Sequence, residues 1–120
     1  MINQIIVICL SAYFSIRFIN MTRTAVHPGK HLAELLAELD MSAAELSRQI
    51  KVPTNRVTQI LNGQRSVTGD TALRLGHFFG SSGEFWMNLQ TLYELRVAEQ
   101  ETGKAVRSLP RLSQISRKTA

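Results

Sequence analysis

The chain has 120 residues, with 14 lysines and arginines against 9 acidic residues, and a net charge of +5. This length suits a single domain with tails and one modest core, and the basic balance suits a polyanionic partner, either nucleic acid or an anionic membrane surface. The one cysteine, Cys9, excludes an internal disulfide and a zinc site built from cysteines, and it is compatible with the reducing cytoplasm.

The first twenty residues, MINQIIVICLSAYFSIRFIN, are far more apolar than the rest of the chain. Four interpretations are open: a signal peptide, a short membrane anchor, an added β-strand, or a stretch translated from upstream of the true start. No lysine or arginine precedes Arg17, which disfavours a signal peptide, and the apolar run of about ten residues is short of the roughly 20 that a helical span needs. We therefore expect residues 1–26 to be an extension without a membrane role, and we favour Met21 as the functional start or a poorly packed leader.

A first helix is predicted from Pro28, because proline suits the first helical position. A buried stripe follows at helical spacing, formed by Leu32, Leu35, Leu36 and Leu39. His27 and His31 have the i, i+4 spacing of a metal-binding helix, but Pro28 places His27 before the helix and no third ligand is evident. We expect no metal or other cofactor.

Residues 42–63 are the most informative segment, because they predict two short helices joined by a tight turn. Ser42 followed by Glu45 is a capping box that opens the first helix, and Pro53 suits the first turn of the second. Gly63 stands where a left-handed residue ends the second helix. Apolar contacts are expected from Ala44, Leu46, Ile50, Val52, Val57, Ile60 and Leu61.

The other face of the second helix is polar and carries Thr54, Asn55, Arg56, Thr58 and Gln59. This layout is typical of a helix-turn-helix whose second helix enters the DNA major groove. A solvated helix with no DNA-binding role has the same polarity, but the distribution of charge favours DNA binding. Residues 46–75 hold five basic residues against one acidic residue, whereas residues 30–45 hold Lys30 against four acidic residues.

A fourth helix is predicted to begin after Thr68, which caps it, and to run through roughly Phe79 before it ends at Gly80. Its side chains able to face the core are Ala72, Leu73, Leu75, Phe78 and Phe79.

A fifth helix is predicted to begin near Glu84, with Ser81 or Ser82 as its cap, and to run to about Gln100. Its apolar face comprises Phe85, Trp86, Leu89, Leu92 and Tyr93. No alternating strand pattern occurs between residues 27 and 101, so the prediction is an all-α domain of five helices.

Residues 102–120 have five basic residues and no acidic one, and we expect a flexible tail. The tail has two interpretations. It is an arm that lies along phosphates or contacts a protein partner, or it is a solvated terminus with no fixed role, and we favour the second interpretation.

Three segments now carry a resemblance to a family: HPGKHLAELL, the run SAAELSRQIKVPTNRVTQILNGQRSVTGDTALRLGHFFG, and SSGEFWMNLQTLYEL. Together, over about residues 27–99, the chain resembles the HigA group of antitoxins within the XRE (Cro/C1-like) helix-turn-helix proteins. The resemblance implies a lambda-repressor-like DNA-binding domain with flexible N- and C-terminal extensions. Base edges would be read by Thr54, Asn55, Thr58 and Gln59. Phosphates would be met by Ser42, Lys51, Arg56 and Arg65, with Ser42 or its helix N-terminus acting because Ala43 stands where many repressors carry a phosphate-binding glutamine.

The resemblance also implies partners. Such antitoxins are dimers that repress their own operon from a palindromic operator in double-stranded DNA and bind a HigB-type toxin, a ribosome-dependent ribonuclease. We expect a homodimer interface at Leu92, Tyr93 and Arg96. The alternatives are a stand-alone phage-type repressor, or a protein-interaction module that binds DNA weakly. No Gly-rich phosphate loop and no Ser/His/Asp arrangement is evident, so we expect no enzyme, and we expect the cytoplasm as its location.

Overall fold

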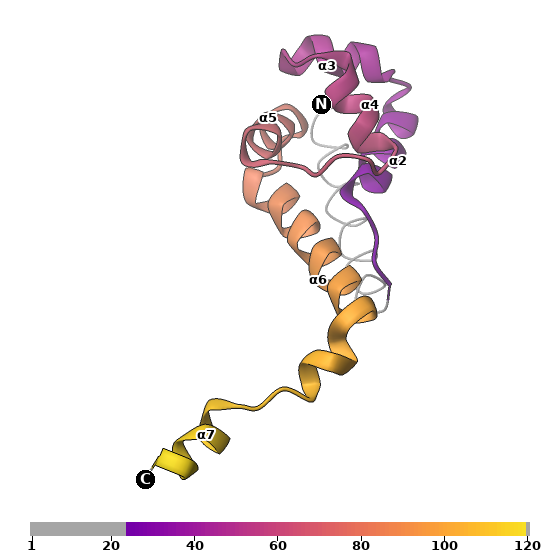
Figure 1. The fold of residues 1–120 in the computed structure, drawn as a ribbon. Coiled ribbons are helices and arrows are strands. Elements are labelled where there is room, and N and C mark those ends of the chain that lie inside the picture. Colours follow the sequence, from indigo (N-terminus) through magenta and orange to yellow (C-terminus); the bar gives the residue numbers. More distant parts are fainter. Residues whose placement is uncertain (1–23, 120) are drawn as a thin grey trace.

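The computed structural model describes residues 24–119, with side chains up to residue 115 (Figure 1). The predictions for residues 1–20 and for Met21 lie outside the described residues. Within residues 24–119 six helices follow one another: α2 (Pro28–Leu39), α3 (Ala43–Ile50), α4 (Thr54–Leu61), α5 (Gly69–Phe79), α6 (Gly83–Arg107) and α7 (Leu112–Thr119). No strand occurs between residues 24 and 119. The prediction of an all-α domain of five helices is confirmed by α2 to α6.

A compact bundle is formed by α2 to α5 together with the first half of α6 (Figure 1). Within it α5 packs along α6, α4 lies between α2 and α3, and α3 also contacts α5. The buried apolar side chains come from every one of these helices and from the loop after α4: Leu32, Leu35, Leu36, Leu46, Ile50, Val57, Ile60, Val67, Ala72, Leu75, Phe79, Trp86 and Leu89. One continuous core therefore supports the helix-turn-helix from behind.

Two predicted core positions are wrong. Ala44 is exposed, because Ala43, Leu46 and Ile50 share one face of α3 at i, i+3, i+7 spacing and Ala44 lies beside that face. Leu73 is 68% exposed. Leu73 falls outside the buried face of α5, whose members share one side of the helix: Thr71, Ala72, Leu75, Gly76 and Phe79.

Serine side chains fix two of the helix starts. The backbone N–H of Glu45 donates to Ser42 Oγ at 3.1 Å at the start of α3. The backbone N–H of Phe85 donates to Ser82 Oγ at 3.1 Å at the start of α6. Of the two serines that the sequence offers for α6, Ser82 is therefore the cap, and both bonds satisfy donors that a helix N-terminus leaves without a partner.

The loop after α4 is tied to α6. Gly63 has φ +73°, which confirms the predicted left-handed end of α4. Further along, the buried backbone N–H of Val67 donates to Gln90 Oε1 at 2.9 Å. This bond joins residues 23 positions apart, so the chain segment that leaves α4 is fixed to the middle of the bundle.

The last helix of the domain is longer than the sequence predicts. It continues to Arg107 instead of ending near Gln100, and it passes through Gly103. Glycine inside a helix costs only about 1 kcal/mol, and the Glu99 side chain covers Gly103 and forms an ion pair with Arg107 across it. The assigned domain end at residue 101 therefore falls inside α6.

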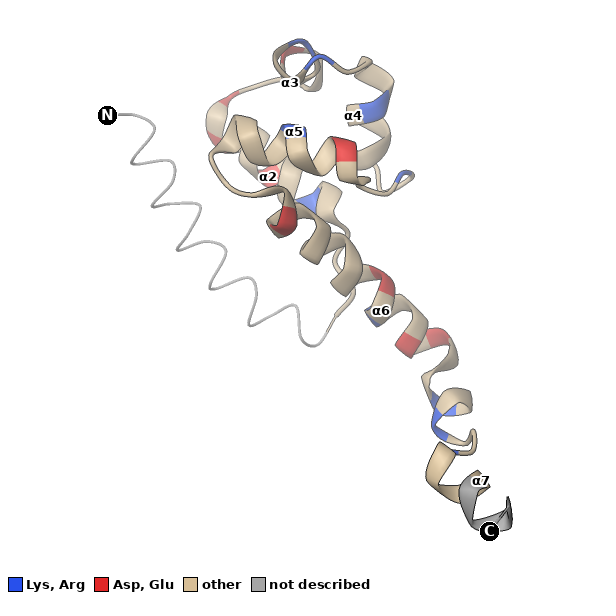
Figure 2. Ribbon diagram, turned by 90° about the vertical axis from the view of Figure 1, so that its left-hand side faces the viewer, with Lys and Arg blue, Asp and Glu red and all other residues tan. Residues whose placement is uncertain are grey.

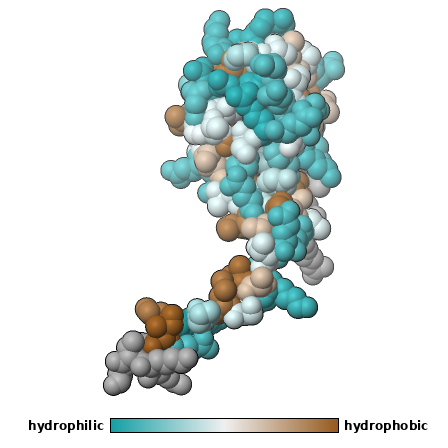
Figure 3. Space-filling view, viewed as in Figure 1, coloured by the Kyte–Doolittle hydropathy of each residue, from teal (hydrophilic) through white to brown (hydrophobic). Residues whose placement is uncertain are grey.

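Beyond the bundle, the outer half of α6 and then α7 project away from it (Figure 1). Apolar side chains gather on this projecting part of the molecule (Figure 3): Leu95, Val106, Leu109, Leu112 and Ile115 are all at least half exposed. The flexibility predicted for residues 102–120 stays a prediction. None of the helices between residues 24 and 119 combines the length and the apolar character needed to cross a bilayer.

Candidate nucleic-acid interface

The turn between α3 and α4 is set by backbone geometry. Lys51 ends α3 in the left-handed conformation with φ +59°, and this conformation ends the helix and turns the chain toward α4. The N–H of Val52 then donates to Ser47 O at 3.1 Å. Pro53 is the residue directly before α4, one position earlier than its predicted place in the first turn. Lys51, one of the predicted phosphate contacts, is exposed at this corner.

The two faces of α4 differ as predicted. Val57 and Ile60 are buried against the bundle, whereas Thr54 and Asn55 in the first turn are exposed. Thr58 is half-buried, and its hydroxyl contacts the carbonyls of Thr54 at 3.1 Å and Asn55 at 3.2 Å. Its hydroxyl proton is therefore used within the helix, which leaves the methyl group as the part of Thr58 that is suited to a thymine methyl.

Gln59 is half-buried and already has a partner. Arg65, on the loop after α4, donates from Nη1 to Gln59 Oε1 at 3.1 Å. A bidentate pair with adenine needs both the oxygen and the amide nitrogen of a glutamine. Gln59 therefore has to give up its contact with Arg65 before it can bind a base. The side chain of Asn55 is exposed, and among the contacts of residues 24–115 it has no hydrogen bond to give up.

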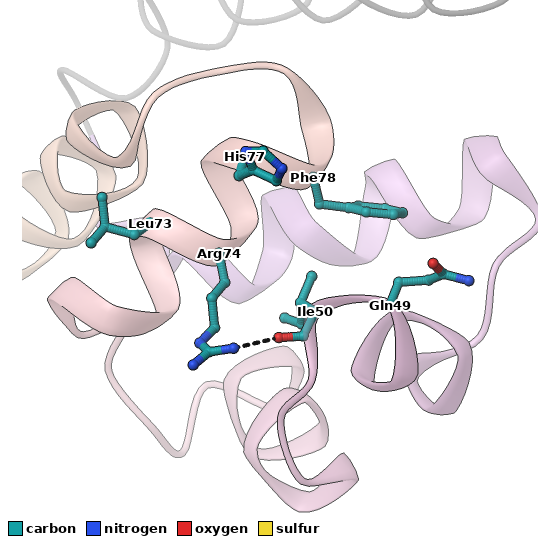
Figure 4. Close-up of a pocket in the computed structure, with 6 residues that line it drawn as sticks. All are labelled: Gln49, Ile50, Leu73, Arg74, His77 and Phe78. Atoms are coloured by element: carbon teal, nitrogen blue, oxygen red, sulfur yellow. Dashed lines mark hydrogen bonds between the residues drawn. The ribbon is translucent and has the colours of Figure 1, made fainter.

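An ion-pair network joins α4 to α5. Arg56 Nη1 lies 2.8 Å from Asp70 Oδ2, and Arg74 Nε lies 3.1 Å from Asp70 Oδ1. Arg74 also donates from Nη1 to the Ile50 carbonyl at 2.8 Å, so it reaches from α5 to the end of α3 (Figure 4). Hydrogen bonds from Arg74 and Arg56 hold the pKa of the Asp70 carboxyl below its usual value. Asp70 and Arg74 were not among the predicted site residues, although their i, i+4 spacing is that of a helical ion pair.

Basic residues gather around the helix-turn-helix, as the sequence predicts. Figure 2 shows lysine and arginine on α3, on α4 and on the loop after α4. Arg48 is paired with Glu45 on α3, where hydrogen bonds from Gln49 and Arg48 lower the pKa of the Glu45 carboxyl. Lys51 and Arg65 are both exposed, so the interface retains basic groups at both ends of α4.

His27 and His31, which have the spacing of metal ligands, lie at the start of α2, and His27 has a structural role there. His27 lies just before α2, and its Nδ1 accepts a hydrogen bond from the Gly29 N–H at 2.9 Å. Burial lowers the pKa of His27, which favours the neutral form that accepts this bond. Between residues 24 and 119 no three His, Cys, Asp or Glu side chains are grouped so as to hold a metal ion.

The three residues predicted for a dimer interface lie on one stretch of α6. Leu92, Tyr93 and Arg96 are each half-buried within the single chain. The Tyr93 ring packs edge-on against the His27 ring, with centroids 4.9 Å apart. Leu95, in the same stretch, is 63% exposed, so α6 presents an apolar side chain to the surface here.

The parts of the chain that match known proteins are those of the helical bundle. The family described as helix-turn-helix matches residues 32–86, which span α2 to the start of α6. A relative in sequence is virulence-associated protein I of Dichelobacter nodosus. It is 42% identical over 78 residues, which make up 64% of this chain and 72% of that protein.

Solved structures resemble nearly the same part of the chain. An addiction module antidote protein of the HigA family from Coxiella burnetii has 50% identity and a TM-score of 0.71, and the match covers 73% of this chain and 98% of that one. The Pseudomonas aeruginosa antitoxin HigA, solved with the higBA promoter, has 41% identity and a TM-score of 0.70, with the same coverage of 73% and 98%.

Proposed function

The chain belongs to the HigA-type antitoxins of the helix-turn-helix family, and on this premise we propose that α4 reads a palindromic operator from the major groove of double-stranded DNA. The observation that carries the proposal is the exposure of Thr54 and Asn55 in the first turn of α4, a helix whose apolar face is buried in the bundle. The Pseudomonas aeruginosa relative was solved with the higBA promoter, which supports DNA binding by this chain.

Each part of the interface has a chemical role in this proposal. Asn55 offers its amide to adenine, and Thr54 offers its methyl or hydroxyl group to a neighbouring base or phosphate. Lys51 and Arg65 meet phosphates at the two ends of α4, and the N-terminus of α3, capped by Ser42, meets a further phosphate. The phosphate contacts set the register of the protein on the duplex, and the base contacts choose the sequence.

A homodimer completes the site. One helix-turn-helix makes a small interface with DNA, and two copies related by a two-fold axis double it over a palindrome. We assign the contact between the copies to Leu92, Tyr93 and Arg96 on α6, which lie next to exposed Leu95. A two-fold contact places the same residues on both partners, so one short stretch of α6 suffices.

Binding to the DNA upstream of its own gene is the first test. With Lys51 and Arg65 from each of two chains on phosphates, we expect the logarithm of the affinity to fall with the logarithm of salt concentration with a slope of roughly −3 to −4. Fluorescence anisotropy over a salt series measures the slope, and mass photometry counts the chains on each duplex. Affinity that does not depend on salt, or one chain on each duplex, contradicts the proposal.

We further propose that the protein represses its own operon and neutralises a HigB-type ribonuclease toxin. Family membership supports this step. The product of a neighbouring gene for a small basic ribonuclease should stop growth when it is produced alone. Growth should return when this chain is produced with it, and the two proteins should purify together through a tag on the toxin. Growth arrest that persists with the chain present, and no shared purification, would count against the antitoxin role.

A further inference from the structure

Asp70 joins the reading helix to α5 through an ion pair at the surface of the bundle. It belongs to the first turn of α5, and its carboxylate meets Arg56 of α4 at 2.8 Å. Arg74 holds both oxygens of the same carboxylate, at 3.1 and 3.2 Å. Because Arg74 is itself bound to the Ile50 carbonyl at 2.8 Å, it directs the exposed carboxylate of Asp70 toward α4.

This arrangement decides how Arg56 is used. The side chain of Arg56 is only 27% exposed, and its guanidinium is directed to α5 by the contact with Asp70. An unpaired arginine in the first turn of a reading helix would meet phosphates of any duplex, whatever its sequence. Asp70 supplies an internal anion in place of that phosphate, and its own negative charge also repels the DNA backbone.

From this geometry we propose that Asp70 is a specificity-determining residue. It keeps Arg56 in an intramolecular ion pair and so weakens binding to DNA that lacks the operator sequence. The inference rests on the proposed function of α4 as the reading helix. Phosphate contacts supply essentially all of the affinity for non-specific DNA, whereas operator binding also draws on base contacts such as those of Asn55. In the operator complex the base contacts fix the position of α4, and Arg56 stays with Asp70. On other sequences α4 has no fixed position, so a released Arg56 finds a phosphate.

The test is Asp70→Asn, which removes the charge and keeps the shape. The two probes are a duplex that the wild-type protein selects from a random-sequence pool and a scrambled duplex of the same length and composition. For the scrambled duplex we expect affinity at 0.1 M salt to rise roughly eight-fold for each chain bound, with a salt slope steeper by about 0.9 for each chain. The ratio of selected to scrambled affinity should fall correspondingly.

Two further variants separate this role from a general effect of charge. In the double variant Asp70→Asn with Arg56→Gln, the scrambled affinity should return to that of Arg56→Gln alone, since the gain requires the released guanidinium. Glu99→Gln removes the same charge from the Glu99–Arg107 pair on α6, far along the chain from α4, and should leave the affinity ratio unchanged. Asp70→Ser repeats the test with a smaller side chain if the asparagine variant folds poorly, as judged by circular dichroism.

An unchanged affinity ratio in Asp70→Asn, or a gain that survives in the double variant or also occurs in Glu99→Gln, overturns the role of Asp70. If the wild-type protein selects no sequence from the pool, the proposed function itself fails, and this outcome is distinct from a selective wild type whose ratio does not respond to Asp70.

Discussion

Gly29→Ala is expected to destabilise the protein by about 3 kcal/mol or more, because it forces the reading helix away from the bundle. A Cβ atom at Gly29 would lie 1.8 Å from the Ile60 carbonyl oxygen and 2.7 Å from its carbonyl carbon. Both atoms belong to the backbone of α4, so no side-chain rotation relieves the clash and α2 must separate from α4. Urea denaturation followed by circular dichroism measures the free energy of unfolding, and operator affinity should fall with it.

Gly69→Ala is the matched control. It adds the same methyl group at the start of α5, where nothing lies within 4 Å of the new atom. We expect its free energy of unfolding to stay within about 0.5 kcal/mol of the wild type. If Gly29→Ala proved as mild as Gly69→Ala, the close approach of α2 to α4 would not exist in solution.

Removing the amide of Asn55 is expected to cost about 1–3 kcal/mol of operator affinity and to relax the base preference at one position of each half-site. Gln59→Ala should have the smaller effect of the two, since Gln59 must give up its Arg65 contact before it can read a base. Anisotropy with operators substituted at single base pairs measures both the affinity and the preference.

Asn88→Ala removes the same amide from an exposed position on α6 and serves as the control. Binding to the operator should not change in this variant. Operator binding that is untouched by both Asn55→Ala and Gln59→Ala would show that α4 does not read bases in the assigned way. Growth rescue that persists when the two changes are combined would show that toxin inhibition and DNA reading are separate properties.

The local features of the bundle follow from nearest-neighbour chemistry and could be predicted. Ser42 and Gly63 mark helix ends through hydrogen bonds and backbone angles that depend on a few adjacent residues. The buried stripe of α2 follows from helical spacing alone. Leu73 shows the limit of that reasoning, because an apolar residue next to a buried face need not be buried, and only the packing of α5 on α6 decides.

The interface is harder to predict where it depends on contacts between elements. The polar face of α4 was evident from the sequence, but the pairing of Arg56 with Asp70 joins residues 14 positions apart. Gln59 and Arg65 meet only because the loop after α4 turns back. The length of α6 was underestimated for a different and local reason: glycine inside a helix costs only about 1 kcal/mol, so Gly103, which the Glu99 side chain covers, does not end the helix.

The bond from the Val67 N–H to Gln90 Oε1 has a consequence for operator architecture. The bond attaches the chain segment that follows α4 to Gln90 of α6. Gln90 is two residues before Leu92, where the proposed two-fold contact begins. In the proposed dimer, the separation between the reading helix and the symmetry axis is therefore set within each subunit, because this segment is bonded to the bundle. One additional base pair between the half-sites turns one of them by about 34° around the duplex, and we expect the proposed dimer to be unable to follow this turn without breaking that bond.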